Sequence, residues 1–200
     1  MAEPTDNRKA PPHGIRRRLV KGGLGAAPVL MTLVSRPVLG DSRCFTPSGF
    51  HSMPTSDHGP SQFCAGRTPG FWKQEQKFGE WPAPYFPTTV SGPGGHEAAR
   101  FNAVLGAPSP YTDTATFVDV LRTDDQGFSG PPHDVARHVV AALLNVAKGW
   151  TPVLSEQLVK RIWSEYWGTG GGTVGFFEPT AGVRWSHEQI AFYLISTQIG

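Results

Sequence analysis

The stretch HDVARHVVAALLNVAKG (residues 133–149) decides the fold. Its apolar residues recur at the spacing of one face of an α-helix and form a single stripe: Val135, Val139, Ala142, Leu143 and Val146. Asp134 suits the positive end of the helix dipole, and Lys148 with Gly149 suits the other end, where a cation and a terminating glycine are favoured. The stretch therefore predicts a central core helix.

Four other stretches carry helical signals: residues 96–106, 116–123, 155–168 and 186–198. Thr116 with Asp119, and Ser186 with Gln189, have the spacing of capping boxes, and Ser155 is a further N-cap candidate. The first two stretches predict short helices, and the other two predict longer ones. With the core helix they predict a mainly α fold.

The chain before these helices reads differently. Residues 41–95 show no sustained helical or strand period and are rich in Pro, Gly, Ser, Thr and aromatic residues. We expect an irregular segment, ordered by aromatic packing and by a disulfide. The predicted fold is a loop-rich N-terminal half packed on a small helical bundle, with residues 41–95 and 96–200 forming one domain.

The first forty residues predict an export signal. A polar start precedes a basic cluster and a mildly apolar stretch, and the small Gly40 ends a plausible cleavage site. The cluster IRRRLVKGG resembles a twin-arginine signal, although Ile15 stands where Ser or Thr is usual. The motif positions are taken by Arg16, Arg17, Leu19, Val20 and Lys21. The alternative, an uncleaved anchor, lacks about 20 uninterrupted apolar residues.

Charge excludes two partner classes for the mature chain. The first forty residues hold seven of the eighteen Lys and Arg residues but two of the sixteen acids, so eleven basic and fourteen acidic residues remain. Nucleic acids and anionic membranes both need clustered cations. We therefore expect no nucleic-acid partner and only a transient membrane contact, through the signal. The predicted location is periplasmic, cell-surface or secreted.

Two cysteines, Cys44 and Cys64, follow the signal closely. In an oxidising compartment they predict a disulfide. The alternative is a zinc site formed by both cysteines with His51 and His58, which lie between them in the sequence. That set lacks the closely spaced ligand pairs of most zinc sites, so the sequence favours the disulfide and predicts no cofactor.

The stretch CAGRTPGFWK (residues 64–73), followed by HVVAALLNVAKG, resembles a class of exported bacterial proteins of unknown function. Those proteins carry a Cys, then Thr-Pro-Gly-aromatic-Trp-Lys, and later a helix of AALLNA type. The motif positions here are Thr68, Pro69, Gly70, Phe71, Trp72, Lys73 and, on the helix, Asn145. The usual Asn-His after the lysine is replaced by Gln74 and Glu75. The resemblance implies export and supplies no catalytic residues.

The motif also has a physical interpretation. Pro69 and Gly70 favour a tight turn, after which Phe71 and Trp72 pack onto apolar surface. Asn145 is placed to bond the backbone of that loop. The alternative interpretation makes the motif a binding surface.

Function stays open at this level, and catalytic residues are unknown. An interaction or structural role at the cell envelope is favoured, because no catalytic motif occurs. The first alternative is a carbohydrate-binding module, since six Trp residues are present: 72, 81, 150, 163, 167 and 185. The second is a metal-dependent exported enzyme using His51, Asp57, His58 and His96. The partner is an unidentified protein or glycan.

Overall fold

The computed structural model describes residues 43–52, 62–106, 109–168 and 175–199. The chain divides into two units, Met1–Gly40 and Asp41–Gly200. The first unit lies outside the described residues, together with the signal-motif residues Arg16, Arg17, Leu19, Val20 and Lys21. Export and cleavage therefore stay predictions.

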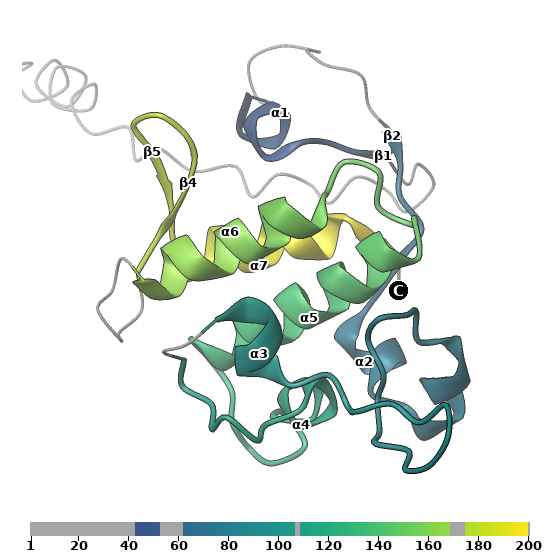
Figure 1. Cartoon of the computed structure of the whole chain (residues 1–200). Coiled ribbons are helices and arrows are strands. Elements are labelled where there is room, and N and C mark those ends of the chain that lie inside the picture. Colours follow the sequence, from purple (N-terminus) through teal and green to yellow (C-terminus); the bar gives the residue numbers. More distant parts are fainter. Residues whose placement is uncertain (1–42, 53–61, 107–108, 169–174, 200) are drawn as a thin grey trace, which may run out of the picture. The chain divides into compact units, whose positions relative to one another are not determined.

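Helix α5 (His133–Ala147) is the centre of the domain, as the sequence predicts. Packed against it are helices α4 (Phe117–Leu121), α6 (Glu156–Gly168) and α7 (His187–Ser196) and strand β3 (Gly66–Arg67) (Figure 1). The predicted stripe is too narrow, because residues between its members are also buried: Ala136, Val140, Ala141, Leu144 and Asn145. The helix is thus enclosed on nearly all sides, which explains why its middle has almost no charged residues.

Three helix starts predicted from capping signals are confirmed. Helix α4 (Phe117–Leu121) begins with a capping box between Thr116 and Asp119. Helix α7 (His187–Ser196) begins with a second box between Ser186 and Gln189. Before helix α6 (Glu156–Gly168), the side chain of Ser155 accepts a hydrogen bond from the Leu158 N–H at 3.1 Å. These local signals satisfy N–H groups that a helix start leaves unpaired.

The helix predicted over residues 96–106 is shorter than expected. Helix α3 spans only Phe101–Leu105 and ends at Gly106, whose φ of 88° suits glycine. The preceding residues are extended, because their backbone bonds to other segments. The Ala99 N–H donates to Phe86 O at 2.8 Å, and its carbonyl accepts from the Phe117 N–H at 2.8 Å.

The segment expected to be irregular contains several short elements. They are β1 (Arg43–Cys44), α1 (Pro47–Ser52), β2 (Gln62–Phe63), β3 (Gly66–Arg67), α2 (Pro69–Trp72) and the 3-10 helix η1 (Glu75–Glu80). Each is too short to show a period in the sequence. In the described part of this half, turns, bends and irregular chain connect them, so this part is loop-rich.

The described residues also form three strand pairs, none of them predicted. Strands β1 and β2 pair antiparallel, and β4 (Phe177–Thr180) and β5 (Val183–Trp185) form a hairpin. Strand β3 pairs in parallel with β6 (Gln198–Ile199), at the opposite end of the domain sequence. About 46% of the described residues are helical and 14% lie in strands or bridges, so the fold is mainly helical but mixed. Among the described residues, no helix has the length and apolarity needed to cross a membrane.

Candidate functional site

The motif loop is tied to the core helix by one side chain, Asn145. Its Oδ1 accepts hydrogen bonds from the Arg67 backbone N–H at 2.8 Å and from Trp72 Nε1–H at 3.1 Å. Its Nδ2 donates to the Arg67 carbonyl at 2.9 Å. Asn145 is fully buried, so each of these bonds satisfies a group that would otherwise be unpaired inside the protein. The expected contact between Asn145 and the loop backbone is confirmed.

The TPGFW part of the motif forms a short helix and not the tight turn expected at Pro69 and Gly70. The Thr68 side chain caps helix α2 by accepting from the Phe71 N–H at 3.4 Å, and Pro69 occupies the first turn, where no N–H is needed. Trp72 is fully buried, as predicted. Trp81 donates from Nε1 to the Trp72 carbonyl at 3.2 Å, which fixes the chain after the helix.

The end of α5 places Trp150 beside this helix. The Trp150 N–H bonds to Asn145 O at 2.9 Å and the Gly149 N–H to Val146 O at 2.8 Å, the two hydrogen bonds of a Schellman motif. Gly149 has the positive φ that this motif requires, 72°. The Trp150 ring stacks on Trp72 with centroids 5.6 Å apart, and its carbonyl accepts from the Ala65 N–H at 2.8 Å.

Cations and rings alternate along the surface of this junction. Lys77 Nζ lies 4.9 Å from the centroid of the Phe71 ring, and the Arg67 guanidinium lies 5.4 Å from the same ring. Arg67 also lies 5.8 Å from the Trp150 ring, over which Lys148 Nζ lies at 5.6 Å. All five side chains are partly exposed. We call Lys77, Phe71, Arg67, Trp150 and Lys148 the cation–aromatic row, and each of its contacts falls within the range of cation–π attraction.

The row carries more positive than negative charge. Lys77 donates to Glu80 Oε1 at 2.8 Å, and this bond lowers the pKa of Glu80 below its usual value, with the charges of Lys148 and Arg67 acting in the same direction. Within the described part of the chain, neither Arg67 nor Lys148 forms an ion pair with a carboxylate. Arg67 Nε is buried without a hydrogen-bond partner there. Two cations are therefore available to an external anion.

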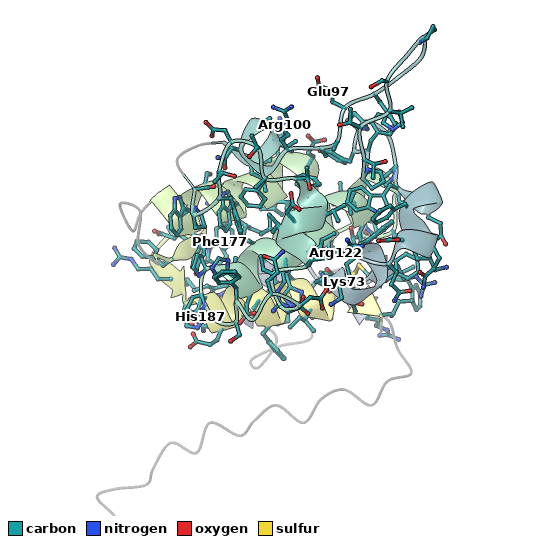
Figure 2. The ribbon with its side chains drawn as sticks, turned by 90° about the horizontal axis from the view of Figure 1, so that it is seen from below. Lys73, Glu97, Arg100, Arg122, Phe177 and His187 are labelled. Atoms are coloured by element: carbon teal, nitrogen blue, oxygen red, sulfur yellow. A yellow bond between two sulfur atoms is a disulfide. The ribbon has the colours of Figure 1, made fainter. Side chains whose placement is uncertain are left out.

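The motif lysine, Lys73, has a structural role. Its Nζ lies 2.6 Å from Asp125 Oδ1 and 3.2 Å from Asp124 Oδ2, and these bonds raise the pKa of Lys73. Arg122 donates to the Lys73 carbonyl at 3.3 Å and to Glu75 at 3.1 Å, and Figure 2 shows Lys73 and Arg122 side by side. The pairs join helix α2 to the end of α4. Glu75, which replaces the histidine of the resembled motif, thus takes part in this network.

The two cysteines are joined, with Sγ atoms 1.97 Å apart and Cα atoms 5.8 Å apart. The predicted disulfide is present, and the zinc alternative is wrong because both sulfur ligands are used. Of the other two proposed ligands, His51 lies exposed on α1, and His58 lies outside the described residues. No group of three potential ligands is placed to hold a metal ion within residues 43–52, 62–106, 109–168 and 175–199.

Loss of the disulfide should destabilise the domain substantially. In the chain-entropy model, a closed loop of 20 residues contributes about 3 kcal/mol. We expect a Cys44→Ser, Cys64→Ser variant to unfold at correspondingly lower urea concentration, and reduced wild type to match it. A variant whose urea midpoint equals that of the oxidised protein would contradict the expected stabilisation.

The remaining enzyme candidates are not assembled into a site in the described structure. His96 stacks on Phe86 with ring centroids 3.9 Å apart, and its backbone pairs with Val90. His51 lies on the separate helix α1. Asp57 lies outside the described residues with His58. The metal-dependent enzyme hypothesis therefore gains no geometric support from the residues described.

Five of the six tryptophans are core residues: Trp72, Trp81, Trp163, Trp167 and Trp185, each at most 9% exposed. Trp163, on helix α6, is 1% exposed. Only Trp150, of the six, is partly accessible. The described structure therefore offers no surface made of several exposed tryptophans, and one accessible indole, that of Trp150, remains.

Burial changes the pKa of His138 on α5. Desolvation lowers its pKa from 6.5 to about 4, against a weaker opposite contribution from Gln198, and its Nδ1 is buried without a hydrogen-bond partner among the described residues. His133 lies five residues earlier on the same helix and bonds Tyr111 Oη through Nδ1 at 3.0 Å. The two histidines therefore have separate environments, as their helical spacing predicts.

This environment predicts a pH dependence of stability. Because the folded pKa of His138 lies below 6.5, the unfolded state binds more protons between pH 4 and 6.5. Above pH 6.5, His138 is neutral in both states and does not reduce the free energy of unfolding. As the pH falls from 6.5 toward 4, proton binding to the unfolded state lowers this free energy by at most about 3 kcal/mol. A His138→Gln variant should lose less stability than wild type between pH 7 and 4.5 in urea titrations. Equal losses would contradict the assignment.

A shallow depression between α6 and β4 is a weaker candidate. Arg161 donates to Glu165 at 2.5 Å and to the Glu178 carbonyl at 2.8 Å, and Glu165 accepts from the Glu178 N–H at 3.1 Å. The Glu178 side chain accepts from the Gly182 N–H at 2.6 Å. Its charged groups thus bond to one another and hold the β4–β5 hairpin on α6.

Sequence reasoning missed the cation–aromatic row. The motif contains Arg67 and Phe71, but Lys148 and Trp150 lie about 80 residues later, and only the fold brings the two stretches together. One usable signal exists, because Gly149 after the core helix predicts a Schellman end, and that motif commonly carries an apolar residue at the position of Trp150. No family model matches the chain, and neither the curated proteins nor the solved structures contain a match.

Proposed function

We propose that residues 41–200 form an exported, disulfide-bonded domain that binds a partner at the cell envelope through the cation–aromatic row. The observation that carries this proposal is the pair of cations, Arg67 and Lys148, that have no carboxylate partner in the described structure although the mature chain has more acids than bases. A charge that no internal ion pair requires is available for binding.

Three features support export. The disulfide between Cys44 and Cys64 belongs to an oxidising compartment. The basic cluster at Arg16 and Arg17 resembles a twin-arginine signal, and the resemblance of the TPGFWK motif to exported bacterial proteins points the same way. The motif itself is used mainly for folding, since its Trp72 and Lys73 are held by internal contacts. Binding is therefore assigned to its flank and not to its buried centre.

Export is tested by expressing the full chain with a C-terminal tag in a bacterium that has the twin-arginine system. We expect a product in the envelope or medium that begins at Asp41 and gains two hydrogens on reduction. An Arg16→Lys, Arg17→Lys variant should stay in the cytoplasm at full length, and Arg8→Lys, outside the motif, should not. Wild type retained in the cytoplasm would overturn the proposal, and export of the double variant would exclude the twin-arginine route.

A further inference from the structure

Arg67 and Lys148 suit a ligand with few negative charges. Each lies next to an aromatic ring, and between them they flank Trp150. Arg67 presents a planar fork of donors that matches the two oxygens of a carboxylate. A long polyanion would meet a domain with fourteen acidic and eleven basic residues, so repulsion elsewhere opposes it. The charge pattern favours isolated carboxylates over a phosphate backbone.

The rings of the row offer apolar contact beside these charges. Phe71 and Trp150 are partly exposed, whereas the neighbouring Trp72 and Trp81 are buried. Trp150 is held rigidly, because it stacks on Trp72 and both its backbone N–H and carbonyl are bonded. A rigid aromatic side chain loses little conformational entropy on binding. A ligand that combines a carboxylate with a compact C–H surface fits both features.

The backbone around the row argues against an acidic peptide. Peptides commonly bind by adding a strand to a free sheet edge. Here β3 pairs with β6 on one side. On the other side, the Ala65 N–H bonds to Trp150, and the Arg67 N–H and carbonyl both bond to Asn145. The described main chain beside the row therefore has no open edge to offer a peptide.

We propose that the cation–aromatic row binds the carboxylate-bearing sugar residues of a glycan that carries few negative charges. A uronic acid carries its carboxylate directly on the sugar ring, so one rigid unit supplies the anion for Arg67 or Lys148 and the C–H face for Trp150 or Phe71. This proposal rests on the proposed envelope role and adds the chemical class of its partner.

The test measures binding of the purified, oxidised exported protein to three probes at low salt. The probes are trigalacturonate, the neutral galactose trimer and poly-glutamate. Binding of each is measured by calorimetry and by tryptophan fluorescence. We expect trigalacturonate to bind, the other two to bind at least about tenfold more weakly, and added salt to weaken the uronate complex. Arg67→Met and Lys148→Met should each weaken it about tenfold, because each removes a charge-assisted contact.

The matched control is Arg184→Met. Arg184 is exposed and lies 4.3 Å from the centroid of the Phe176 ring, so this substitution also removes a cation–aromatic pair. The pair lies at the β4–β5 hairpin, which Figure 1 places at the other end of α6 from α2. The affinity of the Arg184→Met variant for trigalacturonate should equal that of wild type. The urea unfolding midpoint of each variant identifies any loss of binding that is caused by unfolding. Equal binding of the neutral trimer, preferential binding of poly-glutamate, no uronate binding, or an equal loss in Arg184→Met would each overturn the proposal. Export is measured separately, so its failure is distinguishable from failure at this surface.

Discussion

Replacing Asn145 by leucine should lower the free energy of unfolding by about 4 kcal/mol. Leucine has a similar size, so the change removes hydrogen bonds without leaving a large cavity. It leaves three groups without their hydrogen-bond partner: the Arg67 N–H, the Arg67 carbonyl and Trp72 Nε1–H. A buried polar group left without a partner costs about 1–3 kcal/mol. Urea unfolding followed by circular dichroism measures the loss.

Asn102→Leu is the matched control for this change. Asn102 donates to the Tyr111 carbonyl at 3.1 Å and to Asp113 Oδ1 at 2.9 Å, but it is partly exposed, so water can replace its partners. We expect a loss of about 1 kcal/mol or less there. Trp72→Phe removes one bond of the Asn145 set and should cost an intermediate amount. If Asn145→Leu were no more destabilising than Asn102→Leu, Asn145 would not be the tie between motif and core.

Loss of that tie should also disturb the binding surface. Arg67 is held by its backbone bonds to Asn145, and Trp150 by its bond to the Asn145 carbonyl. The same residue therefore fixes both halves of the cation–aromatic row, one through its side chain and the other through its main chain. Asn145 therefore anchors both the motif and the candidate binding surface, so the contacts that stabilise the fold also position the row.

The helical part of this architecture was accessible from sequence because its signals are local. The stripe from Val135 to Val146 and the capping pairs at Thr116 and Ser186 each lie within a few residues of the element they define. The exception is informative. Residues 96–100 have helical composition, yet their backbone pairs with Phe86 and with residues 115–117, so tertiary hydrogen bonds override local propensity.

The candidate site was not accessible in the same way, because its contacts join distant stretches. Arg67 meets Trp150, and β3 meets β6 across about 130 residues. No period or cap reports such a pairing, and a strand of two residues carries no alternation. The net charge of the sequence did not indicate the site either. Composition shows that residues 41–200 hold more acids than bases, whereas the structure shows that Arg67 and Lys148, like Arg184, form no ion pair with a described acid.

Gly66→Ala should destabilise the domain by about 3 kcal/mol or more, the second large effect that we expect. A Cβ at this position would lie 2.5 Å from the Thr197 carbonyl oxygen and 2.9 Å from both Asn145 Nδ2 and Thr151 Cγ2. The first of these atoms belongs to the backbone directly before β6, and the second is held by its bond to the Arg67 carbonyl. Neither atom can move away without breaking the pairing of β3 with β6 or the hydrogen bonds of Asn145. The steric strain caused by the added Cβ can therefore be relieved only by losing one of these interactions.

Gly70→Ala provides the contrast within the same ten-residue motif. The sequence suggests that Gly70 is needed for a tight turn, but the structure gives it no positive φ, and a Cβ there would meet only Thr68 Oγ1, at 3.7 Å. Alanine at this helical position should change stability by less than about 0.5 kcal/mol, or raise it slightly, because it restricts the unfolded chain. Comparable losses for Gly66→Ala and Gly70→Ala would show that the turn, and not the approach of β3 to β6 and α5, sets the requirement for glycine. A large loss at Gly66 alone identifies the close backbone approach as the constraint on this motif.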